Sequence, residues 1–433
     1  MSCKINERYY RIKVKLLIII TLAFLRLGDK NGILNGWRWL IKRLFGLVDL
    51  RVLSVKGYIS QYSGSYQVLR RHRKGISPEI VFSIDSVPFV HQVNLPDLYL
   101  SLCTDIWIRG RSDCLFDFSN RLLLNDFGYY MDEELYTIQS SAVYSIRHHV
   151  ALVRIGSEKD NHVLESGVML GADYSENYYH FLHEVLSRLL VVLSDCSIPL
   201  DIPLLVDKCI NHISQLKEAF NLINNTGRTI IWLEENSYYF VKELYYIPQV
   251  HLIPPQVLKS SKMVYEDIGF DSEYLTAIRN LFILASRKQA FFGRNVMPKK
   301  VFISREGHPN RSYNEEELFE IAKDFGFVKI SPEKYSFLEQ VQLFQQAEII
   351  VGATGAAFSN LLFCKEGSIS ICFVANAVKM SIFSIDASIS GNHLIYLVGV
   401  PTGSNRTLYE MHSDYYIPNA QFRSLLQRVC SAR

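Results

Sequence analysis

The chain has 433 residues, of which 48% are hydrophobic, and a net charge of +3. A chain of this length is too long for one ordinary hydrophobic core, so we expect roughly two to three domains. The small net charge excludes an overall positive potential of the kind that attracts nucleic acids. Eight cysteines without a CxxC motif favour buried thiols in a reducing compartment over a disulfide framework.

The first 50 residues are basic, with ten lysines and arginines against three acidic residues. The apolar run Leu16–Leu25 is shorter than the roughly 20 residues that span a membrane, and no signal-peptide cleavage site follows it. Together with Trp37–Phe45, it predicts an amphipathic segment lying on an anionic membrane surface. The alternative is a buried pair of N-terminal helices with solvated Lys and Arg edges.

Residues 51–165 predict short strands and turns, and an α/β pattern begins near Val168. We expect Asn177 to cap a helix, because its side chain can accept a hydrogen bond from a backbone N–H of the first turn. The predicted strands are 168–171, 204–206 and 229–233, and the predicted helices are 178–193, 213–223 and one within 255–290.

A second α/β unit begins near Lys299. Asn314 predicts the N-cap of a helix that opens with three glutamates and ends at Gly326. Ser336 and Glu339 form a capping box at the start of the next helix. Strands alternating with helices predict a parallel sheet with crossover helices, and the two units predict an α/β fold of two facing Rossmann-like domains with a cleft between them.

A diphosphate site is predicted at the edge of this second unit. The small-residue loop 352–360 follows an apolar strand, and such a loop places backbone N–H groups and a helix dipole at one spot. It is neither a GxGxxG fingerprint nor a P-loop, and small residues there also serve close packing. Arg305 and Arg311 follow the neighbouring strand, where guanidinium groups suit phosphate oxygens. The alternative is a surface loop whose arginines pair with Glu315–Glu317.

The segment 177–184 supplies a candidate general base. His180 and Glu184 are four residues apart, so on a helix they share one face. A metal site with His183 is disfavoured, because the pattern is not HExxH and no distant cluster completes it. The remaining alternative is a core histidine bonded to a glutamate or to the backbone.

In their order and spacing, these segments resemble glycosyltransferase family 61, of the bacterial capsular-polysaccharide type. The resemblance covers about residues 80–400 and rests on 177–184, 301–305, Arg311 and 347–352 with the following small-residue loop. It implies a GT-B-like fold. The implied parts are the basic segment 1–50, an acceptor-side domain 51–290, a nucleotide-sugar domain 291–400 and a tail 401–433 that packs back on the N-terminal domain.

The resemblance further implies an inverting, metal-independent transfer without a cofactor, from a nucleotide sugar (a UDP-sugar is favoured) to a capsular or lipid-linked glycan. The enzyme would be peripheral to the cytoplasmic face of the inner membrane, with no nucleic-acid partner. Glu184, with His180 nearby, would deprotonate the acceptor. The implied donor-binding residues are Arg305, Arg311, Thr354, Gly355, Ala356, Asn360, Glu339 and Gln340, and the acceptor-side residues are Asn177 and Tyr178.

One departure from the family concerns Thr354, because the family loop is usually His-Gly-Ala. Threonine can donate a hydrogen bond but carries no positive charge. Losing a stabiliser of the leaving diphosphate would cost about 2–4 kcal/mol in the transition state. This keeps open a non-catalytic member that binds a nucleotide sugar or a partner transferase in a polysaccharide assembly complex. A nicotinamide-dependent oxidoreductase is disfavoured by the missing glycine fingerprint.

Overall fold

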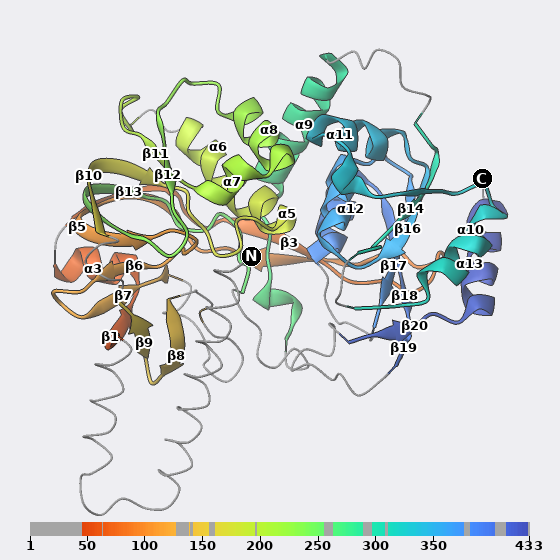
Figure 1. Ribbon diagram of the computed structural model, residues 1–433, viewed down its shortest axis with the longest axis horizontal. Helices are drawn as coiled ribbons and strands as arrows, with labels where there is room; N and C mark the ends of the chain where they lie inside the picture. The colour runs from red at the N-terminus through yellow and green to blue at the C-terminus, as the bar shows by residue number, and fades with distance from the viewer. Residues whose placement is uncertain are drawn as a thin grey trace, which may run out of the picture.

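The computed structural model describes residues 46–62, 64–126, 138, 142–155, 161–194, 197–254, 263–288, 297–307, 311–375, 382–402 and 413–431. The predicted membrane-surface segment 1–50 lies outside these residues except for its last five. The described chain is a mixed α/β structure (Figure 1). None of its helices combines the length and the apolar character needed to cross a membrane.

A large mixed sheet forms the N-terminal part. Its first four strands are parallel and the others are mostly antiparallel. Two of the short strands predicted within residues 51–165, at 98–100 and 114–118, are among them, whereas the strand predicted at 80–84 is wrong, because this segment makes only an isolated bridge from Val81 to Ile395. The strand order is β12 (Ile230–Leu233), β11 (Leu204–Asp207), β10 (Asn161–Met169), β13 (Tyr238–Tyr246), β5 (Leu98–Arg109), β6 (Leu115–Asp117), β7 (Leu122–Leu124), β1 (Leu47–Leu53), β9 (Val150–Arg154) and β8 (Val143–Arg147), with β2 (Ser65–Arg70) beside β5.

Helices α6, α7 and α8 lie above this sheet in Figure 1, whereas α3 lies beside its lower strands. The predicted helix 178–193 is found as three consecutive pieces, and the predicted helix 213–223 is α8. The helices of this part are α3 (Val55–Gln61), α5 (Tyr178–His180), the π-helix η2 (Phe181–Val185), α6 (Leu186–Ser194), α7 (Lys208–His212), α8 (Ser214–Ile223) and α9 (Ser272–Lys288). A separate hairpin consists of β3 (Lys74–Pro78) and β4 (Val90–Asn94).

The predicted parallel sheet with crossover helices is confirmed in the C-terminal part. Gly352 lies opposite Ile303 in the register, and a Cβ on Gly352 would come within 2.9 Å of the Ile303 Cβ. The strand order is β15 (Val328–Ile330), β14 (Lys300–Ile303), β16 (Ile349–Ala353), β17 (Ile369–Val374) and β18 (His393–Val398), and the connections hold α10 (Glu315–Lys323), α11 (Phe337–Gln346), the 3₁₀-helix η6 (Ala356–Phe363) and α12 (Ile382–Ser390). The two-domain GT-B arrangement stays a prediction.

The C-terminal tail differs from our expectation. Helix α13 (Asn419–Ser431) packs beside α10, and Phe422 and Leu426 are buried in one cluster with Phe302 of β14. The tail therefore covers the five-stranded sheet, whereas we expected it to return to the N-terminal domain. The apolar face of α13 is buried by packing against the nearest exposed side of that sheet.

Asn314 stands at the N-cap position of α10, as predicted, but its side chain makes no capping bond to this helix. Its Oδ1 instead accepts from the Ile417 backbone N–H at 2.9 Å, and its Nδ2 donates to the Ile417 carbonyl at 3.0 Å. Asn314 therefore holds the tail in front of α13.

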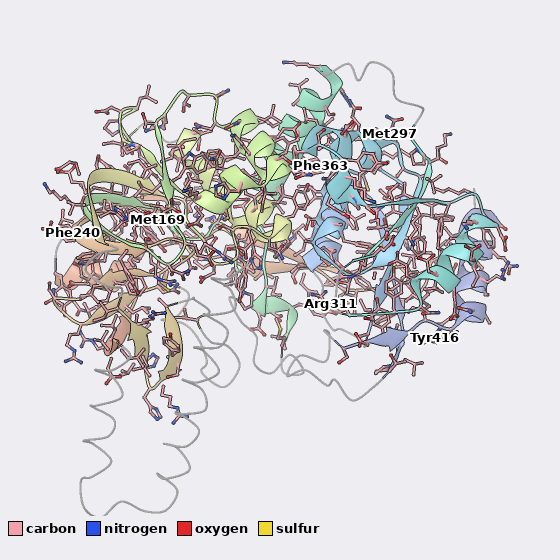
Figure 2. All side chains as sticks on the ribbon, in the orientation of Figure 1. Met169, Phe240, Met297, Arg311, Phe363 and Tyr416 are labelled. Atoms are coloured by element: carbon pink, nitrogen blue, oxygen red, sulfur yellow. The ribbon has the colours of Figure 1, made fainter. Side chains whose placement is uncertain are left out.

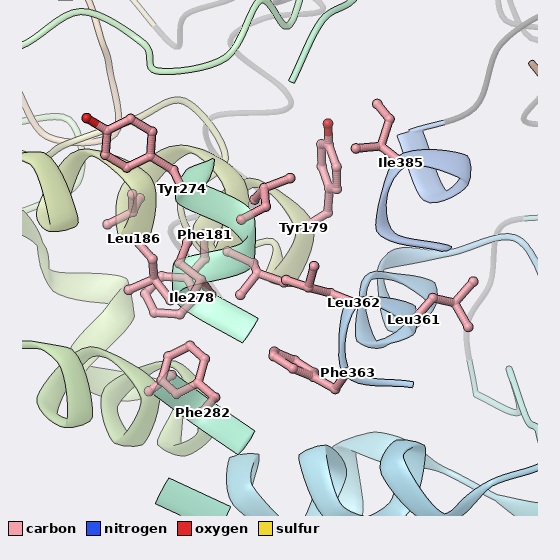
Figure 3. Packing of buried hydrophobic residues seen from close by; sticks show 14 of the residues in the cluster. Tyr179, Phe181, Leu186, Tyr274, Ile278, Phe282, Leu361, Leu362, Phe363 and Ile385 are labelled. Atoms are coloured by element: carbon pink, nitrogen blue, oxygen red, sulfur yellow. The ribbon is translucent and has the colours of Figure 1, made fainter. Parts of the chain in front are cut away.

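One continuous buried cluster joins the two parts of the chain. Figure 3 shows Phe181 and Leu186 packing toward α9, with Phe363 of η6 approaching from the other side. The Phe282 ring lies 6.0 Å from the Phe363 ring, in an edge-to-face arrangement. This shared core fixes the helix that carries the candidate base relative to the loop after β16.

Candidate active site

The candidate base lies at a π-helical turn. Asn177 caps this helix as predicted, because its side chain accepts from the Tyr179 N–H at 2.9 Å. The five residues 181–185 then form the π-helix η2 and are all buried. Single π turns inside α-helices are frequent at functional sites, and they rotate the following side chains relative to a regular helix.

His180 and Glu184 form a hydrogen-bonded pair. The His180 Nδ1 lies 2.6 Å from Glu184 Oε1, and Gln249 donates to Glu184 Oε2 at 3.3 Å. The His180 side chain is 24% exposed, against 9% for Glu184. Burial by itself lowers the pKa of His180, but the Glu184 carboxylate outweighs it, so the net pKa lies above the ordinary value. The imidazole is thus the more accessible member of the pair.

His183 is the core histidine of this segment. Its Nδ1 lies 2.9 Å from the Tyr179 carbonyl and its Nε2 lies 2.8 Å from Asp386 Oδ1 on α12. Both side chains are fully buried, and burial raises the pKa of Asp386 while His183 opposes the rise. His183 therefore links the helix to the C-terminal part and leaves no ring nitrogen for a substrate.

Three ionisable residues near Glu184 were not among our predicted site residues. Burial raises the pKa of Asp113 and places that of Asp173 well above its ordinary range, where the Asp113 charge and their shared hydrogen bond add to the rise. The raised pKa favours the protonated form of Asp173, whose O–H can donate the hydrogen bond that the two carboxyl groups share. Arg188 is buried; its Nη2 donates to the Gly171 carbonyl at 2.8 Å and its Nε donates to the Glu184 carbonyl at 3.3 Å.

On the C-terminal part, Arg305 and Arg311 converge on one backbone oxygen. Arg305 Nη1 donates to the Thr354 carbonyl at 2.8 Å, and Arg311 Nη1 donates to the same oxygen at 3.4 Å. Burial lowers the pKa of Arg311, and the positive charge of Arg305 lowers it further. Arg311 also has a left-handed backbone, with φ of 63°, which is uncommon outside glycine. Two cations held this close favour an anion between or beside them.

The alternative pairing of these arginines with the glutamate run is not what the described residues show. Glu315 accepts from the Ser304 hydroxyl at 2.5 Å and from the Arg305 backbone N–H at 2.8 Å. Lys329 pairs with Glu315 at 3.1 Å and also with Glu316, and Glu317 accepts from Asn419 at 2.9 Å. The Glu315 carboxylate thus holds the Arg305 loop by accepting from the Arg305 backbone N–H, while the Arg305 guanidinium group bonds to other partners.

The small-residue loop is fitted to the Arg305 guanidinium. A Cβ on Gly355 would come within 2.5 Å of Arg305 Nη1, so the absence of a side chain makes room for this group. Ala356 begins η6 and packs against the core. The Thr354 side chain hydrogen bonds to the buried Cys372 thiol, whose pKa is raised mainly by burial. The Thr354 carbonyl, and not its hydroxyl, is the group that both arginines contact.

Asn360 connects the two predicted halves of the site. Its side chain is fully buried; Oδ1 accepts from the Tyr178 hydroxyl at 2.7 Å and Nδ2 donates to Gln340 Oε1 at 3.0 Å. The neighbouring Glu339 serves the capping box with Ser336, as the local sequence predicted. The structure therefore brings together Tyr178, Gln340 and Asn360 and gives Glu339 a role at its own helix terminus.

Among the residues described, no group of three or more His, Cys, Asp or Glu side chains is arranged to hold a metal ion. The absence of a metal requirement stays a prediction.

Comparison with known proteins bears on the chemistry of this site. Residues 178–371 match the family model of glycosyltransferase 61. This match begins at the helix that carries His180 and extends through the Arg305 loop and η6 into β17. No curated protein matches the chain. The match supports a glycosyltransferase, for which a nucleotide sugar and a glycan acceptor are the implied partners.

Proposed function

We propose that this chain is an inverting, metal-independent glycosyltransferase that moves a sugar from a nucleotide sugar, with a UDP-sugar favoured, to a capsular or lipid-linked polysaccharide. One observation carries the proposal. A hydrogen-bonded His–Glu pair and two converging arginines come from different parts of the chain and are linked by the Tyr178–Asn360 hydrogen bond. Sugar transfer needs both a base for the acceptor and cations for the departing diphosphate.

In this proposal His180 is the general base and Glu184 orients it. With Nδ1–H donated to Glu184, the lone pair of Nε2 is available to take the acceptor hydroxyl proton, as in other carboxylate–histidine pairs. The greater exposure of His180 supports this assignment over direct action of Glu184. Gln249 and Arg188 then hold Glu184 through its carboxylate and its backbone carbonyl.

The proposed transfer is a single displacement. The acceptor oxygen forms a bond to the anomeric carbon while the bond from that carbon to the diphosphate oxygen breaks, and the proton passes to His180. The electron pair leaves with the nucleoside diphosphate. Arg305 and Arg311 would stabilise the developing negative charge, and their guanidinium geometry suits phosphate oxygens. Attack opposite to the leaving group inverts the anomeric configuration.

Release of nucleoside diphosphate from a panel of nucleotide sugars, measured in EDTA with water as the acceptor, tests this function. Wild type should hydrolyse one donor class, and His180→Asn should reduce the rate by about a hundredfold or more. His212→Asn is the matched control, because His212 is exposed on α7. Equal rates in wild type and His180→Asn would contradict the assignment.

The second candidate, a non-catalytic nucleotide-sugar or partner-binding protein of an assembly complex, is favoured by one observation. Thr354 stands where the resemblance expects a histidine, and its side chain is engaged with Cys372. Nucleoside diphosphate binding without any release from a donor would support this candidate. A large rate gain in Thr354→His would instead identify a weakened catalyst.

For the cellular location, we propose peripheral attachment to the cytoplasmic face of the inner membrane through residues 1–50. The excess of lysine and arginine over acidic residues in this segment supports it, since such segments bind anionic lipids.

A further inference from the structure

A recess of about 460 Å³ lies away from the candidate active site. It is formed by the C-terminal half of α9, the end of α11 and the turn after η6, and is lined by Arg279, Arg287, Gln345, Cys364 and Lys365, among others. The end of α11 and the turn after η6 directly precede β16 and β17, whereas Arg305 and Thr354 follow β14 and β16. The recess therefore lies at the opposite edge of the parallel sheet. Figure 2 shows Phe363 and Arg311 on opposite sides of the C-terminal part of the chain, and Phe363 precedes Cys364 of the recess.

The lining consists mainly of hydrogen-bond donors. Arg279, Arg287 and Lys365 carry three positive charges, and none of the lining residues that the structure describes has a carboxylate. Within the described chain, the Nε of Arg279 and the Nε2 of Gln345 are buried nitrogen atoms without a hydrogen-bond partner. Buried donors without partners are costly, so they favour a ligand that supplies acceptors.

The charges around the recess are only partly neutralised. Arg279 Nη2 donates to the Cys364 carbonyl at 2.8 Å, which orients it without cancelling its charge. Burial lowers the pKa of Arg279 and the nearby Arg287 lowers it further. Lys365 lies 3.3 Å from Glu348, but Glu348 is also shared with Lys299 at 3.2 Å. Cations therefore remain in excess.

We propose that this recess is a second anion site, which binds a phosphate- or diphosphate-bearing ligand apart from the donor site. Guanidinium groups bind phosphate oxygens in pairs, and an ammonium group adds a compact charge. The volume exceeds that of one phosphate group, and Ile283 and the exposed Leu284 line the same recess. The ligand therefore carries an apolar portion beside its anionic group, as phospholipids and phosphorylated metabolites do.

Calorimetric titration with pyrophosphate tests the site, in a variant in which Arg305→Gln and Arg311→Gln remove the donor-site cations. This variant should still bind pyrophosphate, and adding Arg287→Gln should weaken that binding about tenfold, because one charge-assisted contact is lost. Lys288→Gln is the matched control, because Lys288 is exposed, adjacent on α9 and outside the lining. Arg287 is exposed too, so its replacement should leave the fold intact.

A second arm uses vesicles of phosphatidylcholine and phosphatidylglycerol in equal parts, with the same variants. Pyrophosphate binding that depends on Arg287 identifies a soluble phosphate ligand, and vesicle binding that depends on Arg287 while pyrophosphate fails identifies a lipid headgroup. If neither probe binds, or if Arg287→Gln and Lys288→Gln behave alike, the second site is overturned.

Discussion

The Tyr178 hydroxyl donates a 2.7 Å hydrogen bond to Oδ1 of Asn360, which is fully buried. Tyr178 opens the helix that carries His180, and Asn360 lies in η6 just beyond the loop that receives both arginines. One hydrogen bond therefore connects the candidate base with the candidate diphosphate site. Its strength should affect both the stability of the chain and the geometry of the reaction.

Replacing Tyr178→Phe should lower the free energy of unfolding by about 1–3 kcal/mol, because the buried Asn360 oxygen loses its donor. Turnover should fall with it, since the helix and loop are no longer linked. Urea unfolding and donor hydrolysis measure the two effects. Tyr66→Phe is the control, because the 48% exposed Tyr66 should change stability by less than about 0.5 kcal/mol. Equal effects of the two variants would contradict the link.

The pH dependence of kcat/KM should report His180. A base must be deprotonated, so activity should rise with pH through a pKa above the ordinary histidine value, which Glu184 raises against the opposing effect of burial. In Glu184→Gln this rise, the acidic limb of the profile, should move to lower pH, because the negative charge that raises the pKa of His180 is gone. Glu165→Gln, which removes an exposed carboxylate paired with Lys242, should leave the limb in place. A limb that does not move in Glu184→Gln would argue against the pair.

Local signals in the sequence predicted local features well. The Asn177 cap and the Ser336–Glu339 capping box were confirmed, because each depends on residues a few positions apart. Asn314 occupies the predicted N-cap position, but its side chain does not cap the helix, because Ile417, which is distant in the sequence, offers it a competing pair of bonds. The tail position failed for the same reason.

The parallel sheet and its edge were also predictable, since alternating strands and helices leave few arrangements. The carboxyl pair Asp113–Asp173 was not, because it forms only when the turn after β5 meets the segment after β10. The π turn at 181–185 has no signal in residue type that we could have used. The sequence thus located the helix of the candidate base but not the groups beside it.

Asp173→Asn should stabilise the protein at neutral pH. The folded-state pKa of Asp173 is raised, so folding favours the protonated group. The associated stability is fully present below the unfolded pKa, near 4, and is lost as the pH rises from there through the folded-state pKa. Asparagine donates to Asp113 without this cost, and each avoided pKa unit is about 1.4 kcal/mol. Urea unfolding across pH should show a gain that disappears in acid.

The exposed Asp201→Asn is the control for that series and should show no such gain. An Asp173→Asn variant that is less stable than wild type at neutral pH would mean that Asp173 is ionised and that the proposed proton sharing is wrong.

Gly355→Ala should weaken nucleoside diphosphate binding about tenfold, equivalent to about 1.4 kcal/mol, because the new Cβ displaces the Arg305 guanidinium. Calorimetric titration measures the change. Gly367→Ala is the control that separates strain from binding. The φ of 74° at Gly367 should make alanine destabilising there, but a Cβ would meet open space, and the residue lies before β17. If both variants lose stability and neither loses binding, the fit of Gly355 to Arg305 has no role in ligand binding.

The central claim is that Arg305 and Arg311 hold a nucleoside diphosphate, and titration of UDP, GDP and CDP in EDTA tests it most directly. One nucleotide should bind wild type, and Arg311→Gln should weaken it at least tenfold, whereas Arg423→Gln, which removes an exposed ion pair with Asp324, should not. Failure of all three nucleotides to bind, or binding that Arg311→Gln leaves unchanged, would contradict the account.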